Sequence, residues 1–279
     1  MASSASAHLT LPDPLHAVAA PRRPRVADEP VLGVPLALTD YDGTLDWMDA
    51  AIAHRYRAYF CVATVYSVML CREDPDMRAA TLGAEFTVPD GQPLVWAMNA
   101  LGGHDLPSRV YGPELMERAC ARATDTGARM YLYGGRNQGA LVQLALNLRR
   151  RFPGLQIVGG YSPPYRELTQ EEAEAVAAEI NRSRADIVWV GIGAPKQEKW
   201  IARMRDRIEA PVMVGVGAAF DFHAGLVAQA PSWMQRSGLE WVFRLVAEPR
   251  RLWRRYARYN PRFVRGFAGQ YLRHRLGRS

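Results

Sequence analysis

Asp90 is a carboxylate in a position where a general base could work. It follows the short segment Phe-Thr-Val-Pro at residues 86–89 and precedes Gly91. A carboxylate at the end of a strand, beside a ligand crevice, can take a proton from an attacking hydroxyl group. An Asp before a Gly is also a common turn sequence. Asp90 is therefore a candidate base whose role depends on what the fold places around it.

A second candidate site lies at residues 191–200, which read Gly-Ile-Gly-Ala-Pro-Lys-Gln-Glu-Lys-Trp. The segment follows an apolar strand and opens a helix, where backbone N–H groups can hold an anion. A helix start usually carries acids, so Lys196 at this place indicates an anionic ligand nearby. The segment lacks the third glycine of the dinucleotide fingerprint. A strand-to-helix turn with surface charges is the alternative interpretation.

Asp40 and Asp42 suggest a different chemistry, in the order Asp-Tyr-Asp-Gly-Thr at residues 40–44. The order matches the first motif of haloacid-dehalogenase-like phosphatases, in which one Asp is the nucleophile, the other the acid/base, and Mg²⁺ neutralises the phosphate. It also contains the Asp-x-Asp signature of metal-dependent sugar transferases. Both chemistries need further metal ligands, and the nearest later candidate, around Asp221, offers one acid. We interpret the segment as a turn with Thr44 capping a helix, and keep the other two as alternatives.

The positive charge of the chain is concentrated at its C-terminal end. The chain has 35 Lys and Arg against 28 Asp and Glu, a net charge of +7. Residues 244–279 contain 11 Arg and one acid, which gives +10 and leaves −3 for the remainder. Aromatic residues recur among these arginines at a spacing of three to four, with Pro261 expected to divide two helices. The pattern is typical of an amphipathic helix on an anionic membrane. A nucleic-acid patch or a solvated helix face are the alternatives.

Short apolar segments alternate with helix-like stretches and predict how these candidates are positioned. The expected strands lie at 31–38, 59–64, 129–133, 156–158, 187–192 and 212–216. The expected helices lie at 44–57, 113–126, 138–151, 169–183 and 195–208. This order predicts an α/β fold, Rossmann-like, with a mainly parallel sheet and helices on both faces. Ligands in such folds bind beyond the carboxyl ends of the strands, where the Gly-rich turns lie.

Length and composition exclude several classes of protein. A chain of 279 residues with 48% apolar and 23% charged residues is ordinary for a globular protein and can bury a full core. Its three cysteines form no Cys-x-x-Cys pair, so neither a zinc ribbon nor a disulfide framework is expected. No apolar run approaches the roughly 18 residues of a membrane span. We expect a disordered leader at 1–30, an α/β domain at 31–240 and a basic helical appendage at 241–279.

Taken in order, these motifs resemble the WecG/TagA/CpsF family of bacterial glycosyltransferases. The resemblance extends roughly from residue 31 to residue 255. It depends on segments at 89–91, 93–95, 109–115, 132–135, 191–200, 215–225, 229–231, 238–244 and 248–251. One departure is Tyr66, where the family often has Asn, and it leaves the identity of the sugar open.

The resemblance implies a metal-independent, inverting transfer of a hexose from a UDP-sugar, without a cofactor. The acceptor would be a sugar on a polyprenyl diphosphate, at the cytoplasmic face of the cell membrane. The resemblance places the general base on Asp90. The substrate-binding residues that it implies, with the Gly-rich turn included, are Thr64, Arg109, Gly134, Gly135, Gln197, Asp221, Arg244, Arg251 and Arg254.

Elementary chemistry agrees with this role. An inverting transfer needs a base for the attacking hydroxyl and stabilisation of the charge that grows on the departing UDP. No metal ligands are evident, and arginine forks match phosphate geometry. We predict a hexosyltransferase of exopolysaccharide or cell-surface glycan assembly, peripheral on the inner face of the membrane and without a nucleic-acid partner. The alternatives are an Mg²⁺-dependent phosphatase that uses Asp40 and Asp42, and a nucleic-acid-binding protein that uses the basic tail.

Overall fold

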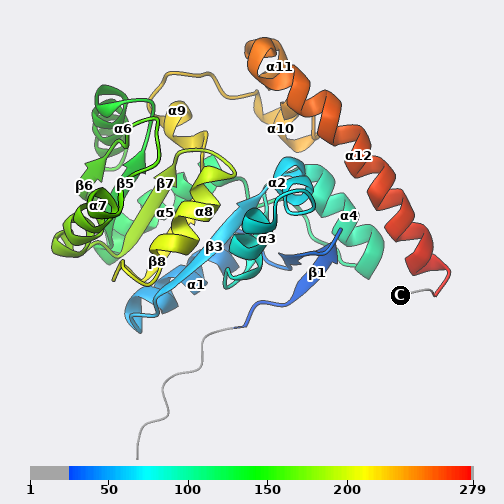
Figure 1. Cartoon of the computed structure of the whole chain (residues 1–279), viewed down its shortest axis with the longest axis horizontal. Helices are drawn as coiled ribbons and strands as arrows, with labels where there is room; N and C mark the ends of the chain where they lie inside the picture. Colours follow the sequence, from blue (N-terminus) through cyan, green and yellow to red (C-terminus); the bar gives the residue numbers. More distant parts are fainter. Residues whose placement is uncertain (1–24, 278–279) are drawn as a thin grey trace, which may run out of the picture.

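Six parallel strands form the main sheet of the computed structural model, which describes residues 25–277 (Figure 1). The strands are β3 (Ala58–Ala63), β4 (Thr87–Pro89), β5 (Arg129–Gly134), β6 (Gln156–Tyr161), β7 (Ile187–Gly191) and β8 (Val212–Gly215). Their order along the sheet is β4-β3-β8-β7-β5-β6. The central strands β3 and β8 are buried along their whole length, as expected for parallel strands covered on both faces. The prediction of an α/β fold with a mainly parallel sheet is confirmed.

Two apolar clusters cover the two faces of this sheet. Side chains alternate along a strand, so Phe60 of β3 belongs to one cluster and the neighbouring Tyr59 to the other. The first cluster includes residues of α1 (Tyr41–Ala53), α5 (Gly112–Thr126) and α6 (Gln138–Arg151). The second includes residues of α7 (Gln170–Ser183) and α8 (Lys196–Met204). Local signals set some of the helix ends, because Thr169 and Glu172 form the predicted capping box of α7.

A small hairpin and three short helices form a third cluster beside the sheet. The hairpin consists of β1 (Asp28–Val31) and β2 (Val34–Ala37), paired antiparallel. The predicted single strand at 31–38 is therefore wrong, because Leu32 and Gly33 turn the chain with φ values of 52° and 83°. Residues 28–30, which we expected in a disordered leader, belong to β1, whereas residues 1–24 lie outside the described residues. The helices are α2 (Val65–Leu70), α3 (Pro75–Leu82) and α4 (Gln92–Gly102).

Four helices follow the last strand: α9 (Ala219–His223), α10 (Ser232–Arg236), α11 (Glu240–Ala247) and α12 (Pro249–Arg275). Helix α12 runs along α2 and α4 and ends beside β1 (Figure 1). Its 27 residues continue through Pro261, so the predicted division into two helices is wrong. Pro261 deprives the carbonyl of Ala257 of its donor, but both residues are exposed and water can replace the bond. Buried Leu252 and Phe263 hold the two halves against the body. No helix among residues 25–277 is long and apolar enough to cross a membrane.

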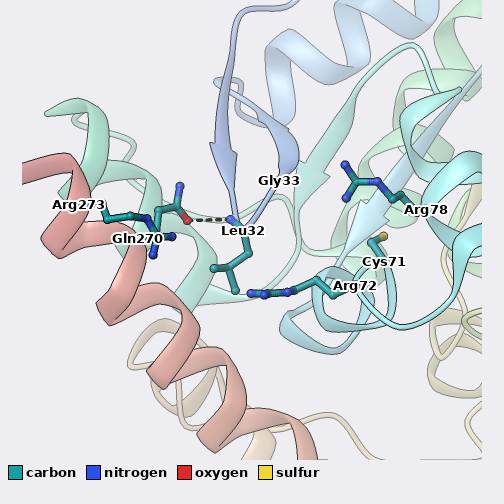
Figure 2. Close-up of a pocket in the computed structure, with 7 residues that line it drawn as sticks. All are labelled: Leu32, Gly33, Cys71, Arg72, Arg78, Gln270 and Arg273. Carbon is teal, nitrogen blue, oxygen red and sulfur yellow. Dashed lines mark hydrogen bonds between the residues drawn. The ribbon is translucent and has the colours of Figure 1, made fainter. Parts of the chain in front are cut away.

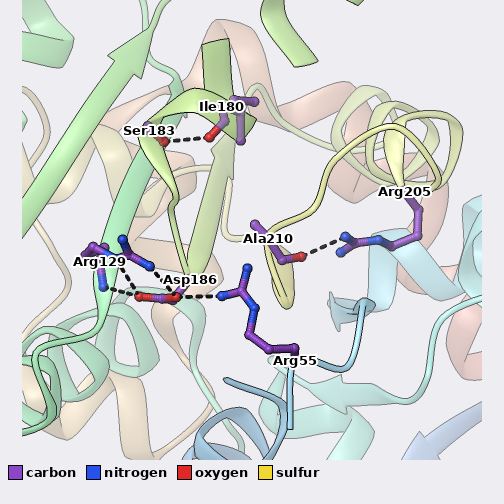
Figure 3. A network of polar contacts seen from close by, with 7 residues as sticks. All are labelled: Arg55, Arg129, Ile180, Ser183, Asp186, Arg205 and Ala210. Atoms are coloured by element: carbon purple, nitrogen blue, oxygen red, sulfur yellow. Dashed lines mark hydrogen bonds and ion pairs between the residues drawn. The ribbon is translucent and has the colours of Figure 1, made fainter. Parts of the chain in front are cut away.

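The charges at the amino edge of the main sheet are paired. Asp186, just before β7, accepts hydrogen bonds from Arg55 at 2.9 Å and from Arg129 at the start of β5 (Figure 3). Arg205 donates to the carbonyl of Ala210 at 2.7 Å, close to the start of β8. These contacts join the starts of three strands, and the two arginines that meet Asp186 are paired although Arg55 is half exposed.

A candidate active site at the carboxyl edge of the sheet

Glycines allow the strand ends to lie unusually close at the carboxyl edge. Gly134, the last residue of β5, has a φ of 136°, and a Cβ on it would lie 2.6 Å from the carbonyl carbon of Gly191 in β7. Gly135 follows with a φ of 87° and donates its N–H to the carbonyl of Gly191 at 3.1 Å. Gly134 and Gly135 were predicted to bind substrate. In the structure their positive φ values, and the close approach of Gly134 to Gly191, require glycine at these positions.

Asp90 lies at this edge, directly after β4. Its backbone N–H donates to Ala63 at the end of β3, and its carboxylate accepts the N–H of Gly112, at the start of α5, over 2.8 Å. The pKa of Asp90 is raised to about 6: burial is the main cause and Glu240 adds to it, while Arg109 and the Gly112 hydrogen bond oppose the shift. The carboxylate is ionised at neutral pH yet takes up a proton far more readily than an ordinary Asp. This is the property that a general base needs.

Arg109 lies beside Asp90 and is held by two contacts. Its guanidinium forms an ion pair with Glu240 at 2.5 Å, and both side chains are almost fully buried. It also stacks on the ring of Tyr111, 4.2 Å from the centroid. Glu240 is the first residue of α11, so the C-terminal helices supply one wall of the site. Sequence reasoning missed Glu240 because it lies 131 positions from Arg109.

Of the three predicted tail arginines, the structure brings Arg244 to the site. Its positive charge lowers the pKa of Asp90, and its guanidinium lies 5.7 Å from the ring centroid of Phe222. The Nε atom of Arg244 is buried without a hydrogen-bond acceptor among the described residues. Arg251 and Arg254 are exposed; the first pairs with Glu248 at 2.6 Å and the second stacks on a neighbouring Trp. No hydrogen bond or ion pair joins either of them to Asp90 within residues 25–277.

Gln197 is buried between the turns that follow β7 and β8. Its amide oxygen accepts the N–H of Gly193 at 3.2 Å, and its amide nitrogen donates to Glu198 at 3.0 Å. A Cβ on Gly215 would lie 2.8 Å from that nitrogen, so the strand end and the side chain fit closely. Gln197, predicted to bind substrate, therefore shapes the turn in this structure.

Glu198 is a buried acid that sequence reasoning did not select. Burial raises its pKa to about 7, while the hydrogen bond from Gln197 and the charge of Arg255 in α12 oppose the shift. One of its carboxylate oxygens has no hydrogen-bond donor among the described residues. The unusual order Pro-Lys-Gln-Glu was the signal that could have identified it. Glu198 links the turn after β7 to the tail helix electrostatically.

Tyr66 and Arg255 fasten the tail helix to the site. The guanidinium of Arg255 lies 3.7 Å from the ring centroid of Tyr66, and Tyr259 meets the same ring edge-on at 5.0 Å. Burial lowers the pKa of Arg255 to about 10. Thr64, the first residue beyond β3, caps α2 by accepting the N–H of Ser67 at 3.3 Å. The residue that departs from the family pattern is therefore a docking contact for α12.

Asp221, predicted as a pocket residue, forms an ion pair with an arginine side chain in this structure. Arg136, two residues beyond Gly134, donates to both carboxylate oxygens of Asp221 at 3.0 and 3.1 Å. Asp221 lies in the short helix α9, so the pair joins the turns after β5 and β8. Sequence reasoning missed Arg136, although its place after the Gly-Gly turn was a signal. Both charges lie at the carboxyl edge.

Asp40 and Asp42 form the start of a helix. The Asp40 carboxylate accepts the N–H of Gly43 at 2.9 Å and is the N-cap of α1, which begins at Tyr41. The prediction that Thr44 caps this helix is wrong, because the Thr44 hydroxyl donates to the Asp40 carbonyl one turn inside. In residues 25–277 no group of three or more His, Cys, Asp or Glu side chains is arranged to hold a metal ion. Neither the phosphatase nor the metal-site alternative gains support.

The fold and this edge are those of an α/β glycosyltransferase. A family model described as "Glycosyl transferase WecG/TagA/CpsF family" matches residues 29–277, and the chain belongs to this family. One relative is the N-acetylglucosaminyldiphosphoundecaprenol N-acetyl-beta-D-mannosaminyltransferase of Bacillus spizizenii. It is 35% identical over 183 residues, which cover 66% of this chain and 68% of the relative.

Proposed function

We propose that this glycosyltransferase moves a hexose from a UDP-sugar, with inversion, to a sugar carried on a polyprenyl diphosphate. The observation that carries the proposal is the half-buried Asp90 at the carboxyl edge, which accepts the N–H of Gly112 at 2.8 Å and lies close enough to Arg109 and Arg244 for their charges to lower its pKa, while burial raises it, to a net value of about 6. The relative from Bacillus spizizenii, whose name gives a diphosphoundecaprenol acceptor, supports the class of acceptor. The product belongs to exopolysaccharide or cell-surface glycan assembly.

In the proposed reaction Asp90 takes the proton of the attacking hydroxyl group while that oxygen bonds to the anomeric carbon. The bond from the anomeric carbon to the UDP oxygen breaks on the opposite face, and negative charge grows on the diphosphate. Glu240 already neutralises Arg109, whereas no carboxylate pairs with Arg244 among the described residues. Arg244 is therefore the cation best placed to meet the leaving group.

The surface of the last helices supports attachment to an anionic membrane. Its exposed apolar side chains are Trp233, Trp241, Val246, Trp253, Val264, Leu272 and Leu276. Arginines lie among them, and each basic residue near an anionic surface contributes about 1 kcal/mol. We place the protein on the cytoplasmic face of the membrane, where its helices enter the headgroup region. Full-length protein should sediment with vesicles that contain phosphatidylglycerol and not with phosphatidylcholine alone.

The transfer is tested by incubating purified protein with a panel of UDP-sugars and polyprenyl-diphosphate-linked sugars, followed by mass spectrometry. The expected product is the acceptor with one added hexose-type unit, together with free UDP. Reactions without acceptor are the control for hydrolysis of the donor. Absence of product with every pair, or product only from sugars linked to another nucleotide, would contradict the proposal.

A further inference from the structure

A basic hollow lies near the far end of α12, away from Asp90. It has a volume of about 510 Å³ and opens between the β1–β2 hairpin, the turn after α2, and the last turns of α12 (Figure 2). Arg273 in this wall lies 18 residues beyond Arg255, which is about 27 Å along a helix. The hollow is lined by Leu32, Gly33, Cys71, Arg72, Arg78, Gln270 and Arg273.

Three arginines line the basic hollow, and no carboxylate does. Arg72, Arg78 and Arg273 are exposed, and none of them forms an ion pair with the described part of the chain. The nearest acids in sequence pair with other cations: Glu73 with two arginines of α12, and Asp74 and Asp76 with Lys199 at 2.7 and 3.6 Å. The positive charge of the hollow is therefore uncompensated within residues 25–277.

Side chains and glycines hold the walls of the hollow in place. Gln270 accepts the N–H of Leu32 at 2.8 Å and donates to the carbonyl of Pro30 at 2.7 Å, so α12 is fixed to the hairpin (Figure 2). A Cβ on Gly266 would lie 3.1 Å from a terminal nitrogen of Arg72, so glycine makes room for that guanidinium. Arg78 approaches the hairpin turn at Gly33 from the side opposite to Arg273. Three separate elements thus supply the three arginines.

We infer that the basic hollow binds a phosphate group. Planar guanidinium forks match phosphate oxygens, and three of them without a carboxylate favour a doubly charged group such as a phosphate monoester or a diphosphate. The phosphate comes either from the headgroup of an anionic lipid or from a soluble diphosphate. The inference does not depend on the proposed transfer, because it concerns binding at a place remote from Asp90.

The test uses full-length protein and two probes. Inorganic diphosphate is titrated by calorimetry, and vesicles of phosphatidylcholine with phosphatidate are compared with phosphatidylcholine alone by sedimentation. The variant Arg72→Ala/Arg78→Ala removes two charges outside the C-terminal helices. Its control, Arg182→Ala/Arg207→Ala, removes two exposed arginines from another face. Arg273→Ala removes the third charge from a different element, and thermal unfolding checks that each variant is folded.

We expect Arg72→Ala/Arg78→Ala and Arg273→Ala to weaken binding at least about tenfold, while the control variant binds as the unaltered protein does. Weaker binding to diphosphate with unchanged sedimentation identifies a soluble phosphate as the ligand. Weaker sedimentation with phosphatidate vesicles, which diphosphate displaces, identifies a lipid headgroup. If both hollow variants match the control variant with both probes, the inference is wrong.

Discussion

Asp90 and Asp40 both come after strands, β4 and β2, yet their surroundings differ. Each carboxylate accepts a backbone N–H at the start of a helix, from Gly112 in one case and Gly43 in the other. Asp40 is exposed and takes that N–H from its own helix, three residues on. Asp90 is half-buried and takes it from a segment 22 residues away, beside Arg109 and the tail helices. The chemistry of a carboxylate therefore depends on what distant segments bring to it.

The largest expected effect comes from Asp90→Asn. The amide can still accept the N–H of Gly112 but takes no proton, so we expect turnover to fall by roughly 10²-fold or more. Binding of UDP, measured by calorimetry, should remain unchanged. Near-normal turnover in this variant would show that Asp90 is not the base, so that Asp90 and Asp40 would not differ in chemical role.

The same variant separates catalysis from stability. Burial holds the pKa of Asp90 above its ordinary value, so the protonated carboxyl group is favoured in the folded state. This contribution to the free energy of unfolding is fully present below about pH 4 and is lost as the pH rises through 6. Asparagine carries no charge at any pH. Asp90→Asn should therefore keep or raise the free energy of unfolding at pH 7, by about 1–3 kcal/mol. A destabilised variant would mean that lost turnover reports on folding.

The next largest effect is expected for Arg244→Gln. Arg244 has no carboxylate partner within the described chain and lies near Asp90, so its loss should lower turnover by roughly 10-fold to 10²-fold. Arg254→Gln, which removes an exposed charge from α12, should cost less. Steady-state kinetics on the same acceptor compare the two. A larger loss at Arg254 would mean that the tail approaches the donor in another arrangement.

A smaller and graded effect is expected from pH. Asp90 acts only when it is ionised, and its pKa is about 6, so kcat/KM should be level above pH 7 and fall about tenfold per unit below pH 6. Burial raises the pKa of Glu198 to about 7, so a second carboxyl group titrates in the same pH range. The limb near pH 6 should survive in Glu198→Gln and vanish in Asp90→Asn. Its disappearance in Glu198→Gln would assign the titration to Glu198.

Local patterns predicted the parts of the fold that depend on local physics. Short apolar runs predicted five strands of the main sheet, and the capping box at Thr169 predicted the start of α7. The three-residue strand β4 and the short helices α2 and α3 were missed, because such short segments carry little periodicity; the 11-residue helix α4 was also missed. The turn at 32–33 was missed because apolar residues surround it. Pro261 was misjudged because exposure and packing, which the sequence does not show, decide whether a helix tolerates proline.

The site shows the same division between local and distant information. Asp90 was selected from its turn, the family resemblance added Arg109 and Arg244, and in the structure the charges of both arginines lower the pKa of Asp90. The partners that define their environment were not found, because they join segments far apart in sequence: Arg109 with Glu240 over 131 positions, and Arg136 with Asp221 over 85. These contacts depend on how the tail and the turns pack against the sheet, and no local pattern encodes that packing.

The smallest effect is expected at Asp40, the other member of the comparison. Asp40→Ala removes the N-cap of α1 and should lower the free energy of unfolding by about 0.5–2 kcal/mol, as caps usually do. Turnover should stay within roughly twofold, because the exposed carboxylate has no place in the proposed transfer. EDTA should leave the rate unchanged for the same reason, because no step of that transfer uses a metal ion. Denaturant unfolding and steady-state kinetics on one preparation measure both quantities. Turnover that collapses in Asp40→Ala, or that EDTA abolishes and Mg²⁺ restores, would give Asp40 a chemical role and show that burial is not what separates it from Asp90.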